Sequence, residues 1–332
     1  MSQCNKFSGG IFCLLAGVFL LSRASCSAEP PPPTAEEVLS YLGFDAKAKQ
    51  DFLAGKIVSK GFKEDTDKEL AVTVAMVVPI PLTNVFTNLR AGKLFEADRD
   101  VIEFKEVTGE EDFDGVRFGP NESAEIRDLS RVEPGSKFNL SEAEVERFRA
   151  LRKRFVSKNA EKDPACVDAM TAEYRGMLRD RCKEYREKGL GGIEPYTRGS
   201  DKAQPGEELR IATRAARLLE DRFPAFHRVF LNYPRDNTKE FEHRFYWIKQ
   251  KVEERPAFIL AHRIFYARPD GCLITERQFY VGHSYNSLQI VVGCLPSGDK
   301  TMIFYTNRTS CDQVAGIGGG LRHNIGRNMM RD

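Results

Sequence analysis

The C-terminal part of the chain alternates in hydrophobicity like an antiparallel sheet and then changes to a helical pattern. Strand-like runs recur from Phe241 to Thr306, and apolar residues at helical spacing follow from Ser310 to about Met330. A period of two is typical of strands, whereas a period of 3.6 is typical of an amphipathic helix. The sequence therefore predicts an α+β fold in which a C-terminal helix grips a curved antiparallel sheet.

The N-terminal residues have the pattern of a secretory signal peptide. Lys6 precedes the apolar run Ile11–Leu21, and small residues follow up to Ala28. This run would rise about 16 Å as a helix, roughly half of a hydrocarbon core. We therefore expect residues 1–28 to be a cleaved signal and the protein to be exported to the periplasm or the extracellular space.

Cys26 leaves a lipid-anchored form open as an alternative. Arg23 stands where lipoprotein signals usually have Leu, and this disfavours the anchor. Removing residues 1–28 takes away two of the 50 basic residues and none of the 48 acidic ones, so the remaining chain is formally neutral. A nucleic-acid partner is disfavoured, because such proteins usually have a basic excess.

Five cysteines remain after residue 28, and an odd number excludes complete pairing within one chain. Cys166 and Cys182 fall on one predicted helix, about 24 Å apart, which is too far for a disulfide. Cys272 and Cys294 flank a predicted hairpin and could meet across it. The alternative is that all five, including Cys311, are buried thiols. No cysteine or histidine spacing predicts a metal site, and no cofactor is predicted.

The rest of the chain divides into three regions. Residues 29–34 are a proline-rich spacer, and residues 35–332 form one predicted α+β domain. The domain begins with short helices at 36–42 and 46–53, strands at 56–63 and 69–78, a helix at 82–94 and strands at 101–107 and 116–118. Residues from about 120 to 235 are charged and predict a helical insertion, with helices at 141–155, 164–185 and 207–223.

A turn signal at residues 268–271 (RPDG) predicts a hairpin in the sheet. If the turn is symmetric, Arg263 faces Glu276 and His262 faces Arg277, and the first pair can form a cross-strand ion pair. A glycine bulge at Gly271 would shift this register and invert the faces. In the symmetric register, one face comprises Phe258, Leu260, His262, Ile264, Tyr266, Leu273, Thr275, Arg277, Phe279 and Val281, and Tyr280 lies on the other.

Polar residues on the strands are the candidates for chemistry. His243, His262 and His283 fall on successive strand segments, and one interpretation groups them with Glu276 or Glu242 as a base or a metal site. Ordinary polar sheet residues are the favoured interpretation. Arg277 lies on a mostly apolar face and needs a partner, which could be an internal acid or the carboxylate or phosphate of a ligand.

The helical pattern at the C-terminus contains the glycine-rich run 316–320. Val314, Ile317, Leu321, Ile325 and Met329 share one face of this helix, and Ser310 can cap its start. The glycines allow close packing against the sheet, with a flexible lid as the alternative. The basic stretch Arg147–Arg154 predicts a solvated helix face, with peripheral contact to anionic lipid as the alternative.

Two segments resemble an exported bacterial family that has no assigned activity. They are residues 69–89 (ELAVTVAMVVPIPLTNVFTNL) and the late block, residues 274–296 (ITERQFYVGHSYNSLQIVVGCLP) followed by residues 304–330 (FYTNRTSCDQVAGIGGGLRHNIGRNMM). The element order is similar to the START-like helix-grip fold. The resemblance implies a cavity for an apolar ligand between the sheet and the C-terminal helix, and it implies no catalytic residue.

The favoured hypothesis is an exported, non-enzymatic binding protein for a lipid or another hydrophobic small molecule. Arg277 or His262 would orient a polar head, and the apolar lining would be Phe258, Leu260, Phe279, Val281, Ile317 and Leu321. One alternative is a hydrolase or cyclase that uses His262 or His283 with Glu276. Another is an envelope protein-interaction module whose helical insertion contacts a partner. The sequence does not determine the oligomeric state.

Overall fold

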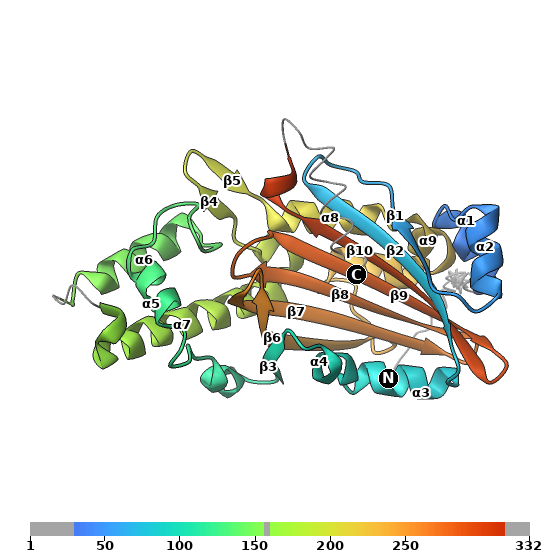
Figure 1. Ribbon diagram of the computed structural model, residues 1–332, viewed down its shortest axis with the longest axis horizontal. Coiled ribbons are helices and arrows are strands. Elements are labelled where there is room, and N and C mark those ends of the chain that lie inside the picture. Colours follow the sequence, from blue (N-terminus) through green and yellow to red (C-terminus); the bar gives the residue numbers. More distant parts are fainter. Residues whose placement is uncertain (1–29, 156–159, 316–332) are drawn as a thin grey trace, which may run out of the picture.

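The computed structural model describes residues 30–155 and 160–315, which contain a curved eight-stranded sheet (Figure 1). The strand order is β1-β2-β10-β9-β8-β7-β6-β3, and all neighbours are antiparallel. The strands span Val58–Gly61 (β1), Glu69–Val78 (β2), Val101–Glu106 (β3), Glu242–Val252 (β6), Arg255–Arg268 (β7), Gly271–Val281 (β8), Ser287–Ser297 (β9) and Lys300–Ser310 (β10). Within these described ranges, no helix has the length and hydropathy needed to cross a bilayer.

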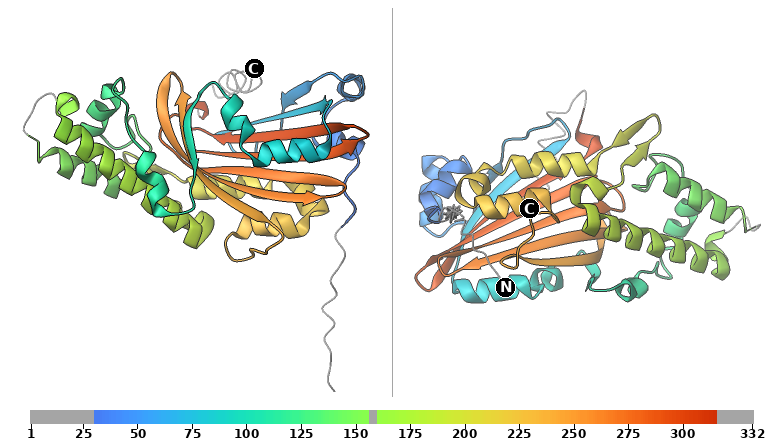
Figure 2. Two further views of the ribbon diagram at one scale, coloured as in Figure 1. Left: turned by 90° about the horizontal axis from the view of Figure 1, so that it is seen from below. Right: turned by 180° about the vertical axis from the view of Figure 1, so that it is seen from behind.

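Helices pack on both faces of the sheet (Figure 2). We call the face under the larger group the α8 face; it contacts α1 (Ala35–Tyr41), α2 (Ala46–Leu53), α7 (Pro164–Lys188), α8 (Pro205–Arg214), α9 (Arg217–Arg222) and α10 (Pro224–Asn232). The opposite α3 face contacts α3 (Leu82–Arg90) and α4 (Lys93–Ala97). Both faces bury apolar side chains, which explains why apolar residues occur at both parities of the central strands.

The register of the β7–β8 hairpin agrees with the prediction. The turn occupies Pro269 and Asp270, and the pairs Arg263–Glu276 and His262–Arg277 lie directly opposite each other. Arg263 Nη2 lies 2.6 Å from Glu276 Oε2, so the predicted ion pair forms. Gly271 introduces no bulge.

A bulge occurs instead farther along the hairpin. Leu260 pairs with Tyr280 but Ala261 pairs with Gln278, so Phe279 is the extra residue. A bulge places consecutive side chains on one face. Phe279 and Tyr280 therefore both join the core of the α8 face, whereas Val281 packs on the α3 face. The predicted faces of Tyr280 and Val281 were wrong for this reason.

The helical insertion is present and is more divided than predicted. Ser141 and Glu144 form the predicted capping box of α6 (Glu142–Arg152), and Asp163 caps α7 ahead of Pro164. The helix predicted at 207–223 is interrupted near Ala216 and forms α8 and α9, and Pro224 then begins α10. Residues 116–118 form no strand, although the sequence predicted one there. They are followed by α5 (Ser123–Ser130), a helix that the sequence did not indicate. A small hairpin, β4 (Tyr196–Arg198) with β5 (Asp201–Ala203), lies between the predicted helices 164–185 and 207–223.

The end of the described chain differs from the predicted helix start. β10 continues to Ser310, which pairs with Ser287 and Glu69, so Ser310 is a strand residue and caps no helix. A short 3₁₀ turn, Asp312–Val314, follows. The rest of the predicted C-terminal helix, including Ile317 and Leu321, lies outside the described residues. The structure thus belongs to the predicted α+β class and contains the predicted curved antiparallel sheet.

Candidate functional site

An apolar cavity lies between the α8 face of β8–β10 and the helices α1, α8 and α9. Its volume is about 80 Å³. Its walls are almost entirely apolar, and they include Val38, Leu42, Phe62, Ala212, Ala215, Ala216, Leu218, Leu219, Phe223, Leu273, Val291, Leu295 and Phe304. Pro32 and Pro33, which precede α1, also line it.

Small residues explain why this part of the interface is hollow. Ala212, Ala215 and Ala216 occupy the helical wall where α8 gives way to α9. On the opposite wall, a Cβ added to Gly293 would meet only Leu273 Cδ2, at an ordinary contact distance of 3.7 Å. Interiors are usually close-packed, so a run of small side chains on both walls leaves space that no neighbour fills.

The charged residues that line the cavity already have counterions. Arg308 Nη1 lies 3.0 Å from Asp65 Oδ2 and 2.8 Å from Glu69 Oε2. Arg268 Nε lies 3.0 Å from Asp270 Oδ1. An anionic ligand would have to compete with these carboxylates, so the cavity favours an uncharged molecule.

Gln289 supplies a polar group at the wall. Its side chain is 2% exposed, and its Oε1 lies 2.6 Å from Thr213 Oγ1. Thr213 Oγ1 also lies 2.8 Å from Leu209 O and accepts a hydrogen bond from Arg277 Nη2 at 2.9 Å. A hydroxyl has one proton and cannot donate to two carbonyl oxygens.

Turning the Gln289 amide by half a turn satisfies every contact of Thr213. Gln289 Nε2 then donates to Thr213 Oγ1, and the Thr213 hydroxyl donates to Leu209 O. In this arrangement the amide oxygen of Gln289 is turned away from Thr213, and Gln289 is among the residues that line the cavity. Gln289 is therefore the candidate hydrogen-bond acceptor of the cavity wall.

Beside Gln289, at the paired position on β8, Arg277 is fully buried and has no carboxylate partner in the described part of the chain. Its guanidinium donates to Tyr185 Oη (3.1 Å), Thr213 Oγ1 (2.9 Å) and Phe230 O (2.8 Å), and it lies 4.3 Å from the centre of the Phe230 ring. Arg277 Nε has no hydrogen-bond partner. Neutral acceptors and a ring therefore take the place of the internal acid or ligand anion that the sequence suggested.

A directional relay of hydrogen bonds continues from Arg277. Because Tyr185 Oη accepts from Arg277, its proton goes to His262 Nδ1, 2.9 Å away. His262 then donates from Nε2 to His243 Nδ1, also at 2.9 Å, and the proton on His243 Nε2 has no partner. Burial lowers the pKa of His243 to about 4, and burial together with nearby positive charge holds the pKa of His262 well below its usual range.

The sequence-predicted lining residues form a solid core at the other end of the same sheet face. Phe258, Leu260 and Phe279 pack beneath α7, and the Phe279 ring stacks on Tyr185 at 4.0 Å between centroids. Val281 lies on the opposite face. Phe258, Leu260, His262, Arg277, Phe279 and Val281 are all buried, and the cavity beneath α8 and α9 is lined by other residues.

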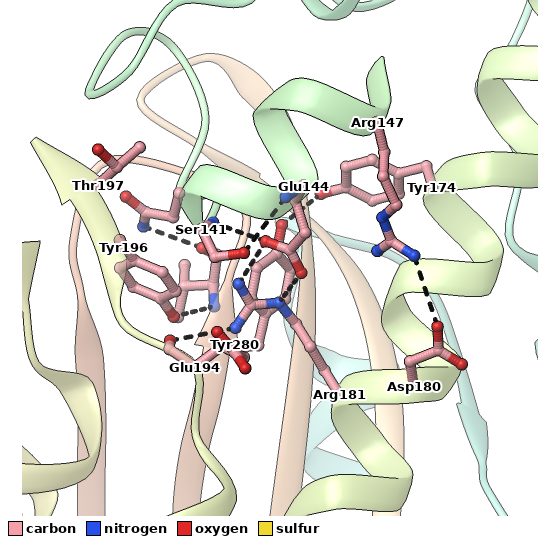
Figure 3. A network of polar contacts seen from close by, with 12 residues as sticks. Ser141, Glu144, Arg147, Tyr174, Asp180, Arg181, Glu194, Tyr196, Thr197 and Tyr280 are labelled. Carbon is pink, nitrogen blue, oxygen red and sulfur yellow. Dashed lines mark hydrogen bonds and ion pairs between the residues drawn. The ribbon is translucent and has the colours of Figure 1, made fainter. Parts of the chain in front are cut away.

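A polar cluster attaches the helical insertion to this filled end (Figure 3). Arg181 on α7 donates from Nε and Nη2 to both oxygens of Glu144 on α6, at 2.7 and 2.6 Å, and both side chains are nearly inaccessible. Arg181 also lies over the ring of Tyr280 on β8, whose hydroxyl contacts that of Tyr174 at 2.9 Å. Each buried charge is paired and each contact joins different elements, so we assign this cluster a structural role.

The histidines do not form the constellation with Glu276 that the alternative interpretation of the sequence allowed. His262 is on the α8 face, whereas Glu276 is on the α3 face with Arg263, so the two side chains point in opposite directions. His283 follows β8, where Nδ1 contacts Ser284 Oγ at 2.8 Å. Glu242 pairs with Arg90 and Arg244. Across residues 30–155 and 160–315, His, Cys, Asp and Glu side chains form no group of three that could hold a metal ion.

The cysteines occupy the positions that the sequence indicated. Cys272 on β8 lies directly opposite Cys294 on β9, as the hairpin interpretation allows. Both are free thiols, and they are packed beneath Val85 of α3. Cys166 and Cys182 are free and buried, both on α7.

Comparison with protein-family models found no match, and comparisons with curated proteins and with solved structures found none either. The resemblance to an exported bacterial family and to START-like proteins therefore stays a prediction. Sequence reasoning missed Gln289 and the small residues of the cavity wall. The one signal that could have indicated the wall is the clustering of alanines at Ala212, Ala215 and Ala216.

Proposed function

We propose that this chain is an exported, non-enzymatic binding protein for a hydrophobic small molecule. The observation that supports this most directly is the apolar cavity under α1, α8 and α9. Ligand sites are typically concave, mostly apolar and provided with a few polar groups that fix orientation. The cavity has these properties, with Gln289 as the orienting group.

The ligand class follows from the charges around the cavity. Arg308 and Arg268 are paired with carboxylates, and Arg277 lies behind the wall rather than in it. An acceptor oxygen on Gln289 favours a ligand that donates a hydrogen bond. We therefore propose an uncharged apolar molecule with a hydroxyl group, such as a lipid alcohol.

The size of the cavity limits how much of the ligand it holds. A cavity volume of about 80 Å³ is well below the roughly 300–1,000 Å³ of a pocket that encloses a whole drug-sized ligand. This matches one ring or a short stretch of chain. A longer ligand would extend past Pro32 and Pro33 or displace α9.

Export and the helix grip belong to the same proposal. Residues 1–28 would be removed as the signal, and residues from about 316 to 330 would form the gripping helix of a START-like fold, with Ile317 and Leu321 toward the sheet.

Competition with a fluorescent apolar probe, N-phenyl-1-naphthylamine, tests the proposal. A straight-chain alcohol should displace the probe better than the alkane of the same length, and the matching carboxylate should displace it least. Gln289→Leu should remove the preference for the alcohol. Native mass spectrometry with extraction of co-purified lipid would identify the natural ligand.

A cavity-filling variant provides the control. Ala212→Phe should weaken probe binding at least tenfold, because the new ring occupies the ligand's space. Ala150→Phe places the same ring on the exposed side of α6 and should leave binding unchanged. Absence of probe binding by the native protein, or equal loss in both variants, would contradict the proposal.

A further inference from the structure

The turn between α2 and β1 presents two large apolar side chains to solvent. Leu53 is 76% exposed and Ile57 is 69% exposed, the two highest values among the exposed large apolar residues of the described chain. The three residues between them are exposed as well. Single exposed apolar residues are common on soluble proteins, but here two of them share one turn. We call residues 53–57 the α2–β1 corner.

Backbone hydrogen bonds hold the α2–β1 corner in a defined shape. α2 ends at Leu53, and Gly55 adopts the left-handed conformation with a φ of 83°. Gly55 N donates to Phe52 O at 2.9 Å, and Lys56 N donates to Asp51 O at 3.0 Å. This pattern closes the helix end in the manner of a Schellman motif. The two apolar side chains therefore project from a fixed turn, and their exposure is part of the fold.

Lysines outnumber acids in the segment of sequence that contains the corner. Lys47, Lys49, Lys56 and Lys60 lie within residues 45–60, against only two acids, Asp45 and Asp51. The Lys56 side chain is 67% exposed, although its ammonium contacts Asp51 at 2.8 Å. Exposed apolar side chains flanked by lysines match the boundary of an anionic bilayer, where apolar groups enter the acyl region and ammonium groups meet the headgroups.

We propose that the α2–β1 corner docks on an anionic membrane surface, with Leu53 and Ile57 inserted and the lysines at the phosphate level. This inference is independent of the proposed ligand, since it rests on exposure and charge. It also has a consequence for the ligand site: Phe52, next to the corner, packs on Phe304 in the wall of the apolar cavity, with 5.7 Å between ring centroids. A docked corner would bring that wall close to the bilayer.

Tryptophan quenching by brominated phospholipid tests the docking locally. The chain has one tryptophan, Trp247, which is buried. In the full chain, Ala54→Trp should be quenched several-fold more strongly by vesicles of brominated phosphatidylcholine mixed with phosphatidylglycerol than Ala97→Trp, an exposed position on α4. Because the readout is local, binding through the apolar run Ile11–Leu21 would not imitate it.

Matched substitutions complete the test. In the Ala54→Trp background, Leu53→Ser with Ile57→Ser should reduce quenching at least tenfold. Leu94→Ser with Ile102→Ser, which removes two other exposed apolar residues, should not. Vesicles of phosphatidylcholine alone should quench less.

Equal quenching at positions 54 and 97, or none at either, would overturn the inference. A concentration-dependent dimer that Leu53→Ser with Ile57→Ser abolishes, without quenching at position 54, would also overturn it and assign the corner to a second copy of the chain. Light scattering after size-exclusion chromatography measures this outcome.

Discussion

The two ends of the α8 face differ in how they are filled. Beneath α7, Phe258, Leu260 and Phe279 pack against tyrosines, and the buried Arg181 has a bidentate carboxylate partner. Beneath α8 and α9, alanines and Gly293 leave a cavity, and the nearby buried Arg277 has only neutral partners. One continuous sheet face can thus provide both a rigid anchor and a proposed ligand site.

Breaking the buried ion pair should lower the free energy of unfolding more than any other substitution considered. Arg181→Met leaves the Glu144 carboxylate buried without its cation and should lower the free energy of unfolding by about 3–5 kcal/mol. Arg147→Met, which removes an exposed contact to Asp180, should cost less than about 1 kcal/mol. Urea denaturation measures both. Similar losses for the two variants would show that the filled end does not depend on its buried charges.

Truncating a leucine should distinguish the filled core beneath α7 from the hollow interface beneath α8 and α9. Leu260→Ala, in the packed core, should destabilise by about 2–5 kcal/mol because it creates a cavity among close neighbours. Leu219→Ala should cost less, since one side of Leu219 already faces the cavity. The same urea titration compares them. An equal or larger cost at Leu219 would contradict a hollow interface.

The relay behind the cavity predicts a pH dependence. His243 and His262 have lowered pKa values in the folded state, so the unfolded chain binds more protons and stability is lost as pH falls. For His243 the loss should occur between about pH 6.5 and its folded pKa of about 4, at no more than about 1.4 kcal/mol for each pH unit. His243→Asn keeps an acceptor for His262 and should flatten the profile over this range. An unchanged dependence of the free energy of unfolding on pH would show that His243 does not cause this loss of stability.

Enlarging an alanine that lines the cavity should change the free energy of unfolding the least. Ala212→Phe adds its ring to empty space and should change the free energy of unfolding by less than about 1 kcal/mol. Ala203→Phe, in the packed core, should cost about 1–3 kcal/mol or more through overpacking. Thermal unfolding at one pH compares the two. A larger loss for Ala212→Phe would indicate that the cavity cannot accept added volume.

Local patterns predicted those features that depend on neighbouring residues. The turn at Pro269–Asp270 determined which strand residues face each other, so the pairs Arg263–Glu276 and His262–Arg277 could be derived before the structure. The capping box of Ser141 and Glu144 located the start of α6 for the same reason. The bulge at Phe279 could not be derived, because it depends on how β8 meets the core beneath α7. That single inserted residue moved Val281 to the other face.

The candidate site was the least predictable part. Its walls come from three parts of the chain that are far apart in sequence, namely α1, the α8–α9 segment and the strands β8–β10. Its emptiness results from small side chains that meet across the interface. Hydrophobic periodicity identifies which side chains are buried, but it does not measure whether they fill the space between two layers. The large apolar residues Phe258, Leu260 and Phe279 were therefore natural candidates for a pocket, although they pack into the core beneath α7.

The α+β class, the hairpin register, several helix starts and the absence of a basic excess follow from the amino-acid order, because each depends on local spacing or on composition. Contacts between distant segments determine which face each residue occupies beyond the bulge, which buried arginine has a counterion and where the sheet is hollow. The physical reason is that packing depends on the fit between surfaces from distant segments, and a difference of a few methyl groups separates a solid core from a cavity.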